Sequence, residues 1–345
     1  MSQSLKFSTL ALTLAVVFVL ELSLGSVMIP LKTVISILAG GQDSGESWRQ
    51  IILLFRLPRA VTAILAGAAL GVAGLEMQTL FRNPLVEPYI LGVSSGASLG
   101  VALVVMVTDG LGWNLLLERA GIMGSTALVV AATLGSLAVL SVVLSFARKV
   151  ESNITLLIVG LMFGYIASSL VSIMMQFSVE HQMQRFITWT FGSFGSVTWQ
   201  QMEIFAPTLA VGILLAWILA KPLNAFLLGD GYARSMGVNV RRVRFWIIAS
   251  SALLAGTVTA YCGPIAFLGI AVPHLCRLLL KTSDHRTLVP AVVLMGATLA
   301  LFADRVAMVP GSQIALPLNA VTSLIGAPVV VAVILKRRHV MEAGA

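Results

Sequence analysis

The residues that could carry out chemistry are few, and they do not form a catalytic site. The nearest approach to a phosphate-binding loop is GGQDSGES at residues 40–47, where Glu46 stands in the place that such a loop gives to lysine. A carboxylate there repels phosphate. The sequence has no H-E-x-x-H motif, and Cys262 and Cys276 lack metal-site spacing. We therefore expect no enzyme activity, no metal site and no cofactor in this chain.

Prolines, charges and glycines interrupt apolar segments where a membrane helix should continue. In FRNPLVEPYILGVSSGAS, residues 81–98, Asn83-Pro84 and Glu87-Pro88 predict a fixed, non-helical hairpin at the end of a helix. CGPIAFLGIAVPHLCR, residues 262–277, packs prolines and glycines into another short span, and AGAALGVAG, residues 66–74, allows close contacts between helices. Broken membrane helices are tolerated inside protein or along a water-filled path, which is typical of a transporter or channel.

The elements that must position these residues are membrane helices. Hydrophobic residues make up 58% of the chain, charged residues make up 10%, and the mean hydropathy is +0.98, values far from those of soluble domains. The apolar runs are continuous rather than alternating, which favours helices over membrane strands. They lie at about 7–28, 57–81, 89–108, 120–146, 154–178, 202–220, 243–262, 265–281, 287–308 and 317–335.

The sequence thus predicts an all-α polytopic protein of about ten membrane helices, in a single domain over residues 1–345, with both termini in the cytoplasm. In that orientation fifteen of the 22 lysines and arginines fall in cytoplasmic segments, as the positive-inside rule requires. The net charge of +8 then reflects topology and attraction to anionic lipid, and nucleic acid is not an expected partner. The first run is longer than a secretory signal core, so we interpret it as a helix.

Six sequence strings, in this order along the chain, together resemble the permease subunits of ABC importers for iron siderophores, haem and vitamin B12, the FecCD-type family. Each string alone is a weak signal, whereas six in register are specific, and they cover the chain from about residue 50 to the C-terminus. The strings are RLPR (56–59), MQTLFRNPLVEPYILGVSSGA (77–97), WTFGSFGSVTW (189–199), LGDGYARSMGV (228–238), GPIAFLGIAVPHLCR (263–277) and LIGAP (324–328).

This resemblance implies the type II ABC importer architecture in a bacterial inner membrane. Such an assembly pairs two permeases, for which we favour a homodimer, with two cytoplasmic ATPase subunits and an extracytoplasmic substrate-binding protein. ATP and Mg would be bound by the ATPase subunits, which agrees with the lack of a nucleotide motif in this chain. Membrane lipid is the remaining expected partner.

The resemblance places a cytoplasmic gate in two turns. Asn83 and Leu85 in the proline hairpin form one side, and the turn KVESNIT, residues 149–155, supplies Ser152 and Asn153 as the other. The related vitamin B12 permease has Ser-Thr at the second site, and the longer Asn153 would alter the size of the closed constriction. The alternative is that both are ordinary helix-end turns, with Ser152 or Asn153 capping the next helix.

The longest cytoplasmic connection, residues 221–244, resembles the ATPase-docking segment of the family. A glycine bend precedes the predicted short helix Tyr232–Met236, and small residues would let that helix lie close in a cleft of the ATPase. An arginine in it would pair with an acidic side chain. A basic loop lying against anionic lipid is the alternative. The residues implied in coupling are Gly229, Ala233, Arg234 and Gly237.

Arginines on the outer side resemble those with which the family meets glutamates of the binding protein. Arg56 and Arg59 are expected to cap the second helix beside a proline break, and a guanidinium–carboxylate contact is strong and directional. A further docking arginine of the family corresponds to Met308 here. Arg305 lies one turn earlier and is expected either to substitute for it or to pair with Asp304 or lipid phosphate.

Two acidic residues within predicted helices, Glu76 and Glu21, do not follow the family pattern. Charged groups in membrane helices usually face a cavity or a partner, so Glu76 is expected either to line the substrate path or to pair with Arg277. Three residues near the end of the apolar run at 154–178 are expected either to pack within the protein or to line the pore. They are Met174, Met175 and Gln176.

The sequence therefore predicts a permease for a large chelate, with a ferric siderophore favoured over haem and haem over cobalamin. That order reflects how often the family carries each substrate. The competing class is an ion- or proton-coupled secondary transporter, which would need paired carboxylates near the middle of the bilayer.

Overall fold

The computed structural model of the protein describes residues 2–25, 27–41, 45–111, 125–150, 152–308 and 315–342. Within these ranges the chain is helical, and an isolated antiparallel bridge joins Met308 to Ala315. Residues 42–44 of the polar GGQDSGES loop and the first five residues of the predicted apolar run at 120–146 lie outside the described ranges.

Each predicted apolar run coincides with a helix, which confirms an all-helical fold for the described part of the chain. The corresponding helices are α1 (Gln3–Ser23), α4 (Leu57–Leu80), α5 (Val93–Leu111), α7 (Ser125–Lys149), α8 (Asn153–Gln176), α10 (Trp199–Ile218), α13 (Val240–Cys262), α14 (Leu268–Leu280), α15 (His285–Ala307) and α16 (Leu318–Glu342). Among the described residues seven helical stretches are long and apolar enough to cross a membrane, and α5, α14 and α16 carry shorter apolar stretches. That all ten cross stays a prediction.

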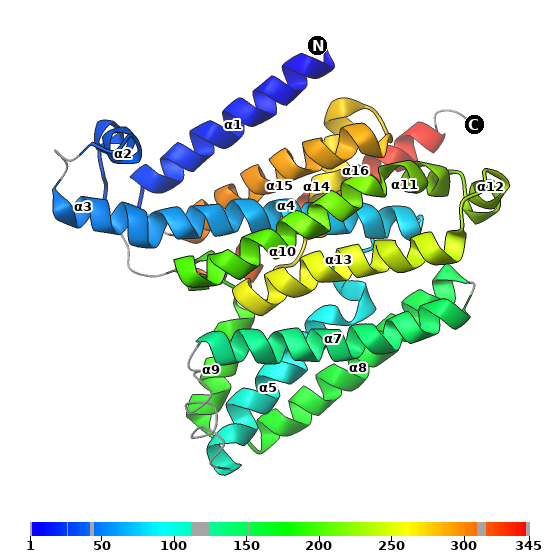
Figure 1. The fold of residues 1–345 in the computed structure, drawn as a ribbon, viewed down its shortest axis with the longest axis horizontal. Coiled ribbons are helices and arrows are strands. Elements are labelled where there is room, and N and C mark those ends of the chain that lie inside the picture. The colour runs from blue at the N-terminus through cyan, green and yellow to red at the C-terminus, as the bar shows by residue number, and fades with distance from the viewer. Residues whose placement is uncertain are drawn as a thin grey trace.

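Shorter helices connect these elements at the two ends of the bundle. They are α2 (Leu31–Leu38), α3 (Glu46–Gln50), the π-helical turn η1 (Ile51–Arg56), η2 (Pro88–Leu91), α9 (Glu180–Thr190), η3 (Phe194–Ser196), α11 (Ala220–Leu227) and α12 (Asp230–Ser235). Figure 1 shows α2, α3 and α9 at one end, called here the α3 end. The start of α1, the end of α16, α11 and α12 lie at the opposite end, called the α12 end.

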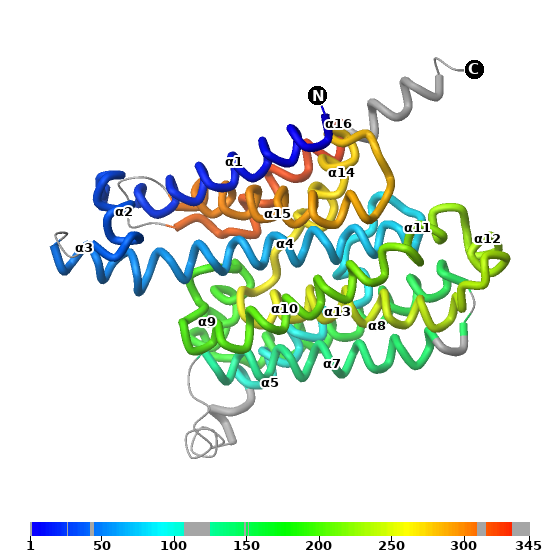
Figure 2. Tube along the Cα trace, turned by 45° about the horizontal axis from the view of Figure 1, so that its top comes forward, coloured from blue at the N-terminus to red at the C-terminus, as the bar shows by residue number. Residues whose placement is uncertain are grey.

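Helix α4 occupies the centre of the bundle. It packs against α15, α13 and α14, and Figure 2 shows α1 and α15 on one side of it with α5, α7 and α8 grouped on the other. Small residues make this packing close, as the sequence predicts: a Cβ atom on Gly74 would lie 1.8 Å from the carbonyl oxygen of Gly269, and one on Gly67 would lie 2.2 Å from that of Gly296. The helix axes at these points are therefore as near as backbones allow.

The second predicted membrane helix begins earlier than the sequence indicates. We expected Arg56 and Arg59 to cap it, but the helical stretch runs without a break from Glu46 to Leu80 through α3, η1 and α4. The N–H of Leu57 donates to the carbonyl of Ile52, five residues back, so the wider π-helical turn ends just before Pro58. Because the bonding register has already shifted there, the missing N–H of proline does not end the helix.

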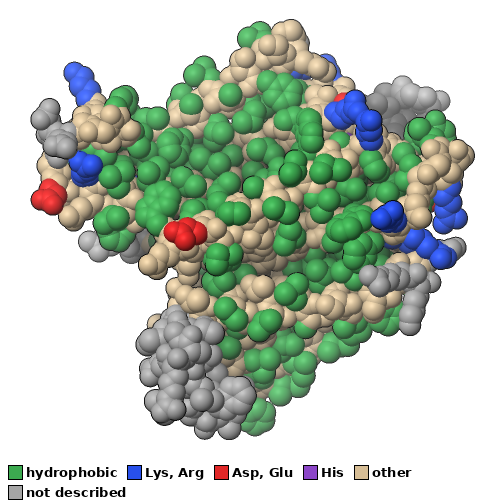
Figure 3. All heavy atoms as spheres, in the orientation of Figure 1, with side chains coloured by type: hydrophobic (Ala, Val, Ile, Leu, Met, Phe, Trp, Pro, Cys, Tyr) green, Lys and Arg blue, Asp and Glu red, His purple; other side chains and the backbone are tan. Residues whose placement is uncertain are grey.

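The exterior is apolar along the middle and charged at the ends. On the face shown in Figure 3, hydrophobic side chains cover the central band, and lysines and arginines lie toward the α3 end and, in larger number, the α12 end. Exposed large side chains on α8 include Ile154, Ile158, Met162 and Tyr165. A soluble protein would bury such residues, so this distribution fits a protein surrounded by lipid.

Candidate functional site

The proline hairpin after α4 has the non-helical form that the sequence predicts. Residues 81–87 connect α4 to η2, and Arg82 adopts a left-handed conformation with φ 47°. The side-chain oxygen of Asn83 accepts a hydrogen bond from the N–H of Leu85 at 3.0 Å, which closes a tight turn. Asn83 and Leu85 are both exposed.

The second predicted gate turn lies beside the first. Ser152 caps α8, because its hydroxyl accepts a hydrogen bond from the N–H of Thr155 at 3.3 Å, so the helix-cap interpretation holds for this residue. The side-chain amide of Asn153 instead donates to the carbonyl of Leu80 at 2.9 Å, three residues before Asn83. The structure thus brings the two turns together in one chain, and their gating role stays a prediction.

Glu87, to which the sequence assigned no function, anchors the hairpin on α14. Its carboxylate accepts a hydrogen bond from the N–H of Phe267 at 2.8 Å, and Phe267 precedes α14 in a left-handed conformation with φ 68°. Burial raises the pKa of the Glu87 carboxyl above its usual value, and the hydrogen bond from Phe267 partly offsets this. The side chain of His274 on α14 meets the carbonyl of Pro84 at 2.9 Å.

An open depression of about 370 Å³ lies between this hairpin and the break before α14. Its walls are apolar and aromatic apart from the Glu87 carboxyl. The lining residues are Leu85, Glu87, Tyr89, Ile90, Phe267 and Ile270. The predicted gate residue Leu85 therefore borders a cavity rather than a flat surface.

The predicted docking segment folds as two short helices, α11 and α12. Helix α12 spans Asp230–Ser235, so it begins two residues earlier than the predicted helix Tyr232–Met236, and Gly229 precedes it with φ 103°. Gly237 ends the segment with φ 81°, a conformation that favours glycine. The sequence predicted both glycine turns correctly.

The two faces of α12 differ in the way that a docking helix requires. Ala233 is fully buried against the rest of the chain, whereas Tyr232 and Met236 are 49% and 61% exposed and Arg234 is also exposed. Exposed apolar side chains beside one arginine, outside the lipid-facing band, are suited to a protein partner.

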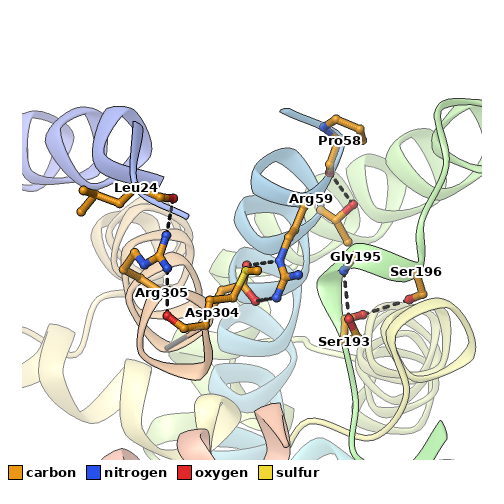
Figure 4. Close-up of polar contacts among 10 residues, drawn as sticks. Leu24, Pro58, Arg59, Ser193, Gly195, Ser196, Asp304 and Arg305 are labelled. Carbon is orange, nitrogen blue, oxygen red and sulfur yellow. Dashed lines mark hydrogen bonds and ion pairs between the residues drawn. The ribbon is translucent and has the colours of Figure 1, made fainter. Parts of the chain in front are cut away.

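At the α3 end, Arg59 is paired within the chain. Its guanidinium forms two contacts with the carboxylate of Asp304, from Nε at 2.6 Å and from Nη2 at 2.7 Å, and Figure 4 shows this pair bridging α4 and α15. The Asp304 side chain is fully buried and that of Arg59 is 20% exposed. Removing one partner of such a buried pair typically costs about 3–5 kcal/mol.

Arg56 and Arg305, which we expected to dock a partner, also make contacts within the chain. Arg56 donates to the carbonyls of Leu22 and Ser23 at 2.7 and 3.0 Å, and also to that of Val27. Arg305 donates to the carbonyl of Leu24 and, at 2.8 Å, to that of Met308. The expected pairing of Arg305 with Asp304 is replaced by that of Arg59, because Asp304 points across to α4 (Figure 4).

These arginines hold the end of α1 against α4 and α15. The C-terminal carbonyls of a helix have no partners of their own, and guanidinium groups satisfy them here. Glu21 of α1 is buried near the same arginines and Asp304, and its Oε2 atom has no hydrogen-bond partner among the described residues. The first role of this cluster is therefore structural, and docking of a partner by Arg56, Arg59 and Arg305 stays a prediction.

Glu76 does not pair with Arg277, and it does not reach a surface. The side chain is 1% exposed on α4, and neither carboxylate oxygen has a hydrogen-bond partner among the described residues. Ser250 of α13 faces this carboxyl group, but its hydroxyl donates to the carbonyl of Gly212 at 3.2 Å. Arg277 instead donates to Gln78 at 2.6 Å. The expected ion pair with Arg277 is thus not formed, and a place for Glu76 on the substrate path stays a prediction.

The polar end of α8 is accessible. Met174 and Met175 are half-buried and Gln176 is exposed at the last residue of the helix, toward the α3 end. That these three residues line the pore stays a prediction. In the described part of the chain, no three His, Cys, Asp or Glu side chains lie close enough to hold a metal ion.

Comparison with known proteins gives one consistent result. The FecCD transport family matches residues 13–336. The vitamin B12 import system permease protein BtuC of Klebsiella pneumoniae is 35% identical over 310 residues, covering 86% of this chain and 88% of the relative. The hemin transport system permease protein HmuU of Yersinia pestis is 34% identical over 298 residues, covering 86% of each chain.

Solved structures share the fold. An inward-facing conformation of a proposed metal-chelate type ABC transporter superposes with a TM-score of 0.82 at 29% identity, over 96% of this chain and 98% of that one. PsaBC from Streptococcus pneumoniae in complex with Fab is similar in fold alone, with a TM-score of 0.51 at 16% identity.

Proposed function

Because the chain belongs to the FecCD transport family, we propose that it is the permease subunit of an ABC importer that takes up a ferric siderophore or a related metal chelate. The named relatives are permeases for vitamin B12 and hemin, and a structural neighbour is of the metal-chelate type. We place haem and cobalamin after a siderophore. The substrate path would run through a dimer, for which a homodimer is favoured.

The observation that carries this proposal is the form of α12. A buried Ala233, a left-handed Gly237 and an exposed face with Tyr232, Arg234 and Met236 give a short helix ready for a cleft in a partner. A protein that worked alone would have no need of exposed apolar side chains at a charged end of the bundle. We assign that face to a separate cytoplasmic ATPase, which binds ATP and Mg, and the α3 end to an extracytoplasmic binding protein.

The α12 end is then cytoplasmic, and the chain is a multi-pass protein of a bacterial inner membrane. The helices of residues 1–345 act as a single transmembrane domain with a docking segment at 221–244. Asn83, Leu85, Ser152 and Asn153 form the gate, because the hydrogen bond from Asn153 to Leu80 holds both turns at that same end.

A proton-coupled secondary transporter is the alternative, and the buried carboxyl group of Glu76 is the observation that favours it. Such a mechanism needs a protonatable group that alternates between the two sides of the membrane. The Glu76 side chain is 1% exposed, and neither of its carboxylate oxygens has a hydrogen-bond partner among the described residues that could pass a proton to it, which supports the importer instead.

Replacing Gly237 with tryptophan tests the proposal. Nothing lies within 4 Å of the position of a Cβ atom there, so the isolated chain has room for the indole. A partner docked on α12 would occupy that space and clash with it. We expect Gly237→Trp to lose co-purification of the ATPase and ATP-driven uptake together, while Gly237→Ala, which has the same backbone strain, keeps most of both.

Gly40→Trp is the matched control at the opposite end, because Gly40 also has a positive φ, of 85°, and open space around it. This variant should bind the ATPase normally. Uptake into proteoliposomes that proceeds without ATP or ATPase, driven by a proton gradient and abolished by Glu76→Gln, would favour the secondary transporter.

A further inference from the structure

The docking segment is connected to both predicted gate turns by buried polar contacts. One connection passes through Arg244 at the start of α13, and the other passes through Asn224 of α11 and His285 of α15. Asn224 and Arg244 lie within the predicted docking segment, but none of these three residues was assigned a role of its own from the sequence. Each of them joins helices that are distant along the chain.

Arg244 joins α12 to the turn between α7 and α8. Its side chain is only 2% exposed, although it carries a charge. One end of the guanidinium lies 3.1 Å from the carboxylate of Asp230, the first residue of α12, and the other donates to the carbonyl of Val150 at 3.0 Å. Val150 is two residues before Ser152 of the gate. Because the guanidinium is rigid and planar, it holds Asp230 and Val150 at a fixed spacing, and a shift of Asp230 also displaces Val150.

Asn224 and His285 join α11 to the end of α4. The carbonyl oxygen of Asn224 accepts from the backbone N–H of His285 at 2.8 Å, and the amide nitrogen donates to Asp284 at 2.6 Å, which fixes the orientation of the amide. His285 Nδ1 lies 2.7 Å from the same oxygen, and its Nε2 lies 2.8 Å from the hydroxyl of Thr79. Thr79 is the penultimate residue of α4, just before the proline hairpin.

The contact with Asn224 fixes the tautomer of His285. The Asn224 oxygen is an acceptor, so Nδ1 carries the proton. The Thr79 oxygen lies 2.8 Å from both Nε2 and the carbonyl of Leu75, and these two acceptors share its single hydroxyl proton. Hydrogen bonds therefore run in one direction from His285 through Asn224 to the Asp284 carboxylate. A continuous donor-to-acceptor chain of this kind is stiff, because rotating one member breaks two bonds.

Two further contacts close a ring around the gate. The guanidinium of Arg82 in the hairpin lies 2.7 Å from where a Cβ atom on Gly229 would be, so the hairpin touches the bend before α12 directly. The amide of Asn153 ties the α7–α8 turn to Leu80 at the end of α4. The docking segment and the two gate turns thus form one closed set of contacts.

We propose that Arg244 and the Asn224–His285 pair are positioning residues that carry movement of the docked α12 to the two gate turns. This inference rests on the proposed function, in which α12 binds the ATPase. Each link joins a different gate turn to the docking segment, so displacement of α12 moves both turns in concert. Contiguous packed and hydrogen-bonded contacts of this kind can carry coupling between distant sites.

The test measures gate movement separately from assembly and ATP hydrolysis. Spin labels at Ile154→Cys, on the gate turn, and at Trp48→Cys, at the α3 end, report the distance between the two by pulsed electron resonance in the complete complex with its ATPase. Both positions are exposed, and the native cysteines are buried. We expect the wild-type complex to shift this distance when ATP and vanadate are added.

Arg244→Met and Asn224→Ala are the test variants. Each should bind the ATPase and hydrolyse ATP at close to the wild-type rate, whereas the fraction of complexes with the ATP-induced distance should fall about tenfold. Asp230→Asn, which keeps Arg244 and its bond to Val150, should give a smaller loss and serves where Arg244→Met does not fold. The exposed residues Arg286→Met and Ser283→Ala lie outside the docking segment, are the matched controls and should behave as wild type.

Three outcomes are distinguishable. Uncoupling confined to the test variants supports the linkage. A wild-type distance change in Arg244→Met and Asn224→Ala, or equal losses in the two controls, overturns the linkage and leaves the proposed function standing. A wild-type chain that neither binds the ATPase nor responds to ATP instead overturns the proposed function.

Discussion

Single residues in this protein hold irregular backbone in place, and Glu87 is the clearest case. The residue it caps, Phe267, has a left-handed conformation that is costly for a bulky side chain. A hydrogen bond of 2.8 Å from its N–H to the Glu87 carboxylate, with Gly326 leaving room for its ring, stabilises that conformation. The proline hairpin and the break before α14 therefore depend on each other.

The raised pKa of Glu87 predicts a pH dependence. Burial favours the neutral carboxyl group in the folded protein, so the contribution of Glu87 to the free energy of unfolding is fully present below its ordinary pKa of about 4.3 and is lost as the pH rises through the raised pKa. A glutamine side chain at this position would stay neutral and still accept the hydrogen bond from Phe267. We expect the midpoint of thermal unfolding of Glu87→Gln, relative to wild type, to rise across that interval.

Unfolding in detergent, followed by intrinsic fluorescence from about pH 4 to about pH 8, measures this difference. A difference that is constant across the whole range would show that Glu87 titrates normally. Glu203→Gln, at an exposed residue of α10, is the control substitution.

At the scale of residues, the sequence predicted local turn conformations better than the partners of individual side chains. Asn83, Leu85, Gly229 and Gly237 occupy the turns expected of them, because proline and glycine restrict the local backbone wherever they occur. The pairing of Arg59 with Asp304 joins residues 245 positions apart and depends on how α4 and α15 pack. Local patterns carry no information on such pairs, so the sequence predicted a docking role for Arg59 and did not predict its ion pair with Asp304.

At the scale of elements, the contacts of α4 make strong demands on residue size. Gly74 faces the backbone of Gly269, and backbone cannot move aside as the end of a flexible side chain can. Gly256 on α13 also lies inside a helix, but its nearest neighbour would be a methyl group of Val93 at 3.4 Å, an ordinary contact distance. The two glycines thus form a matched pair.

We expect Gly74→Ala to lower the free energy of unfolding by about 1–3 kcal/mol, because α4 and α14 must separate to admit the methyl group. Gly256→Ala should be neutral or stabilising by about 0.4–1 kcal/mol, since alanine restricts the unfolded chain and fits the available space. Equilibrium unfolding of both variants in mixed micelles decides this. Equal effects at the two positions would show that the α4–α14 contact is not tight.

The apolar runs predicted where the long helices lie, but they did not predict where each helix begins and ends. Each run became a helix because only helices satisfy their backbone groups in lipid. The π-helical turn before Pro58 was not predicted, because the proline was interpreted as a helix end. Helix α9 is polar on one side and too short for a membrane run, so an apolar search passed over Glu180–Thr190.

At the scale of the whole molecule, the arrangement predicts which end faces the cytoplasm. Ser235 on α12 and Ser47 on α3 are exposed at opposite ends, and the native Cys262 and Cys276 are buried and should not react. With an impermeant maleimide on intact spheroplasts, Ser47→Cys should be labelled directly. Ser235→Cys should be labelled only after permeabilisation, because the positive-inside rule places α12 in the cytoplasm.

The opposite labelling pattern would invert the topology and move the docking and gate assignments to the other side. Wild-type protein without an added cysteine is the blank in both conditions. The chain should be expressed without its ATPase in this experiment, so that no partner covers Ser235.

The central position of α4 has a consequence for how the protein is made. Helix α4 is the second long helix to leave the ribosome, yet the helices that enclose it, α13, α14 and α15, are synthesised much later. Until those helices are made, the polar residues of α4, including the buried Glu76, contact lipid, the translocon or helices that are not their final neighbours. The packing around α4, at the centre of the molecule, is therefore completed last. We expect membrane proteases to degrade nascent chains that end before α15.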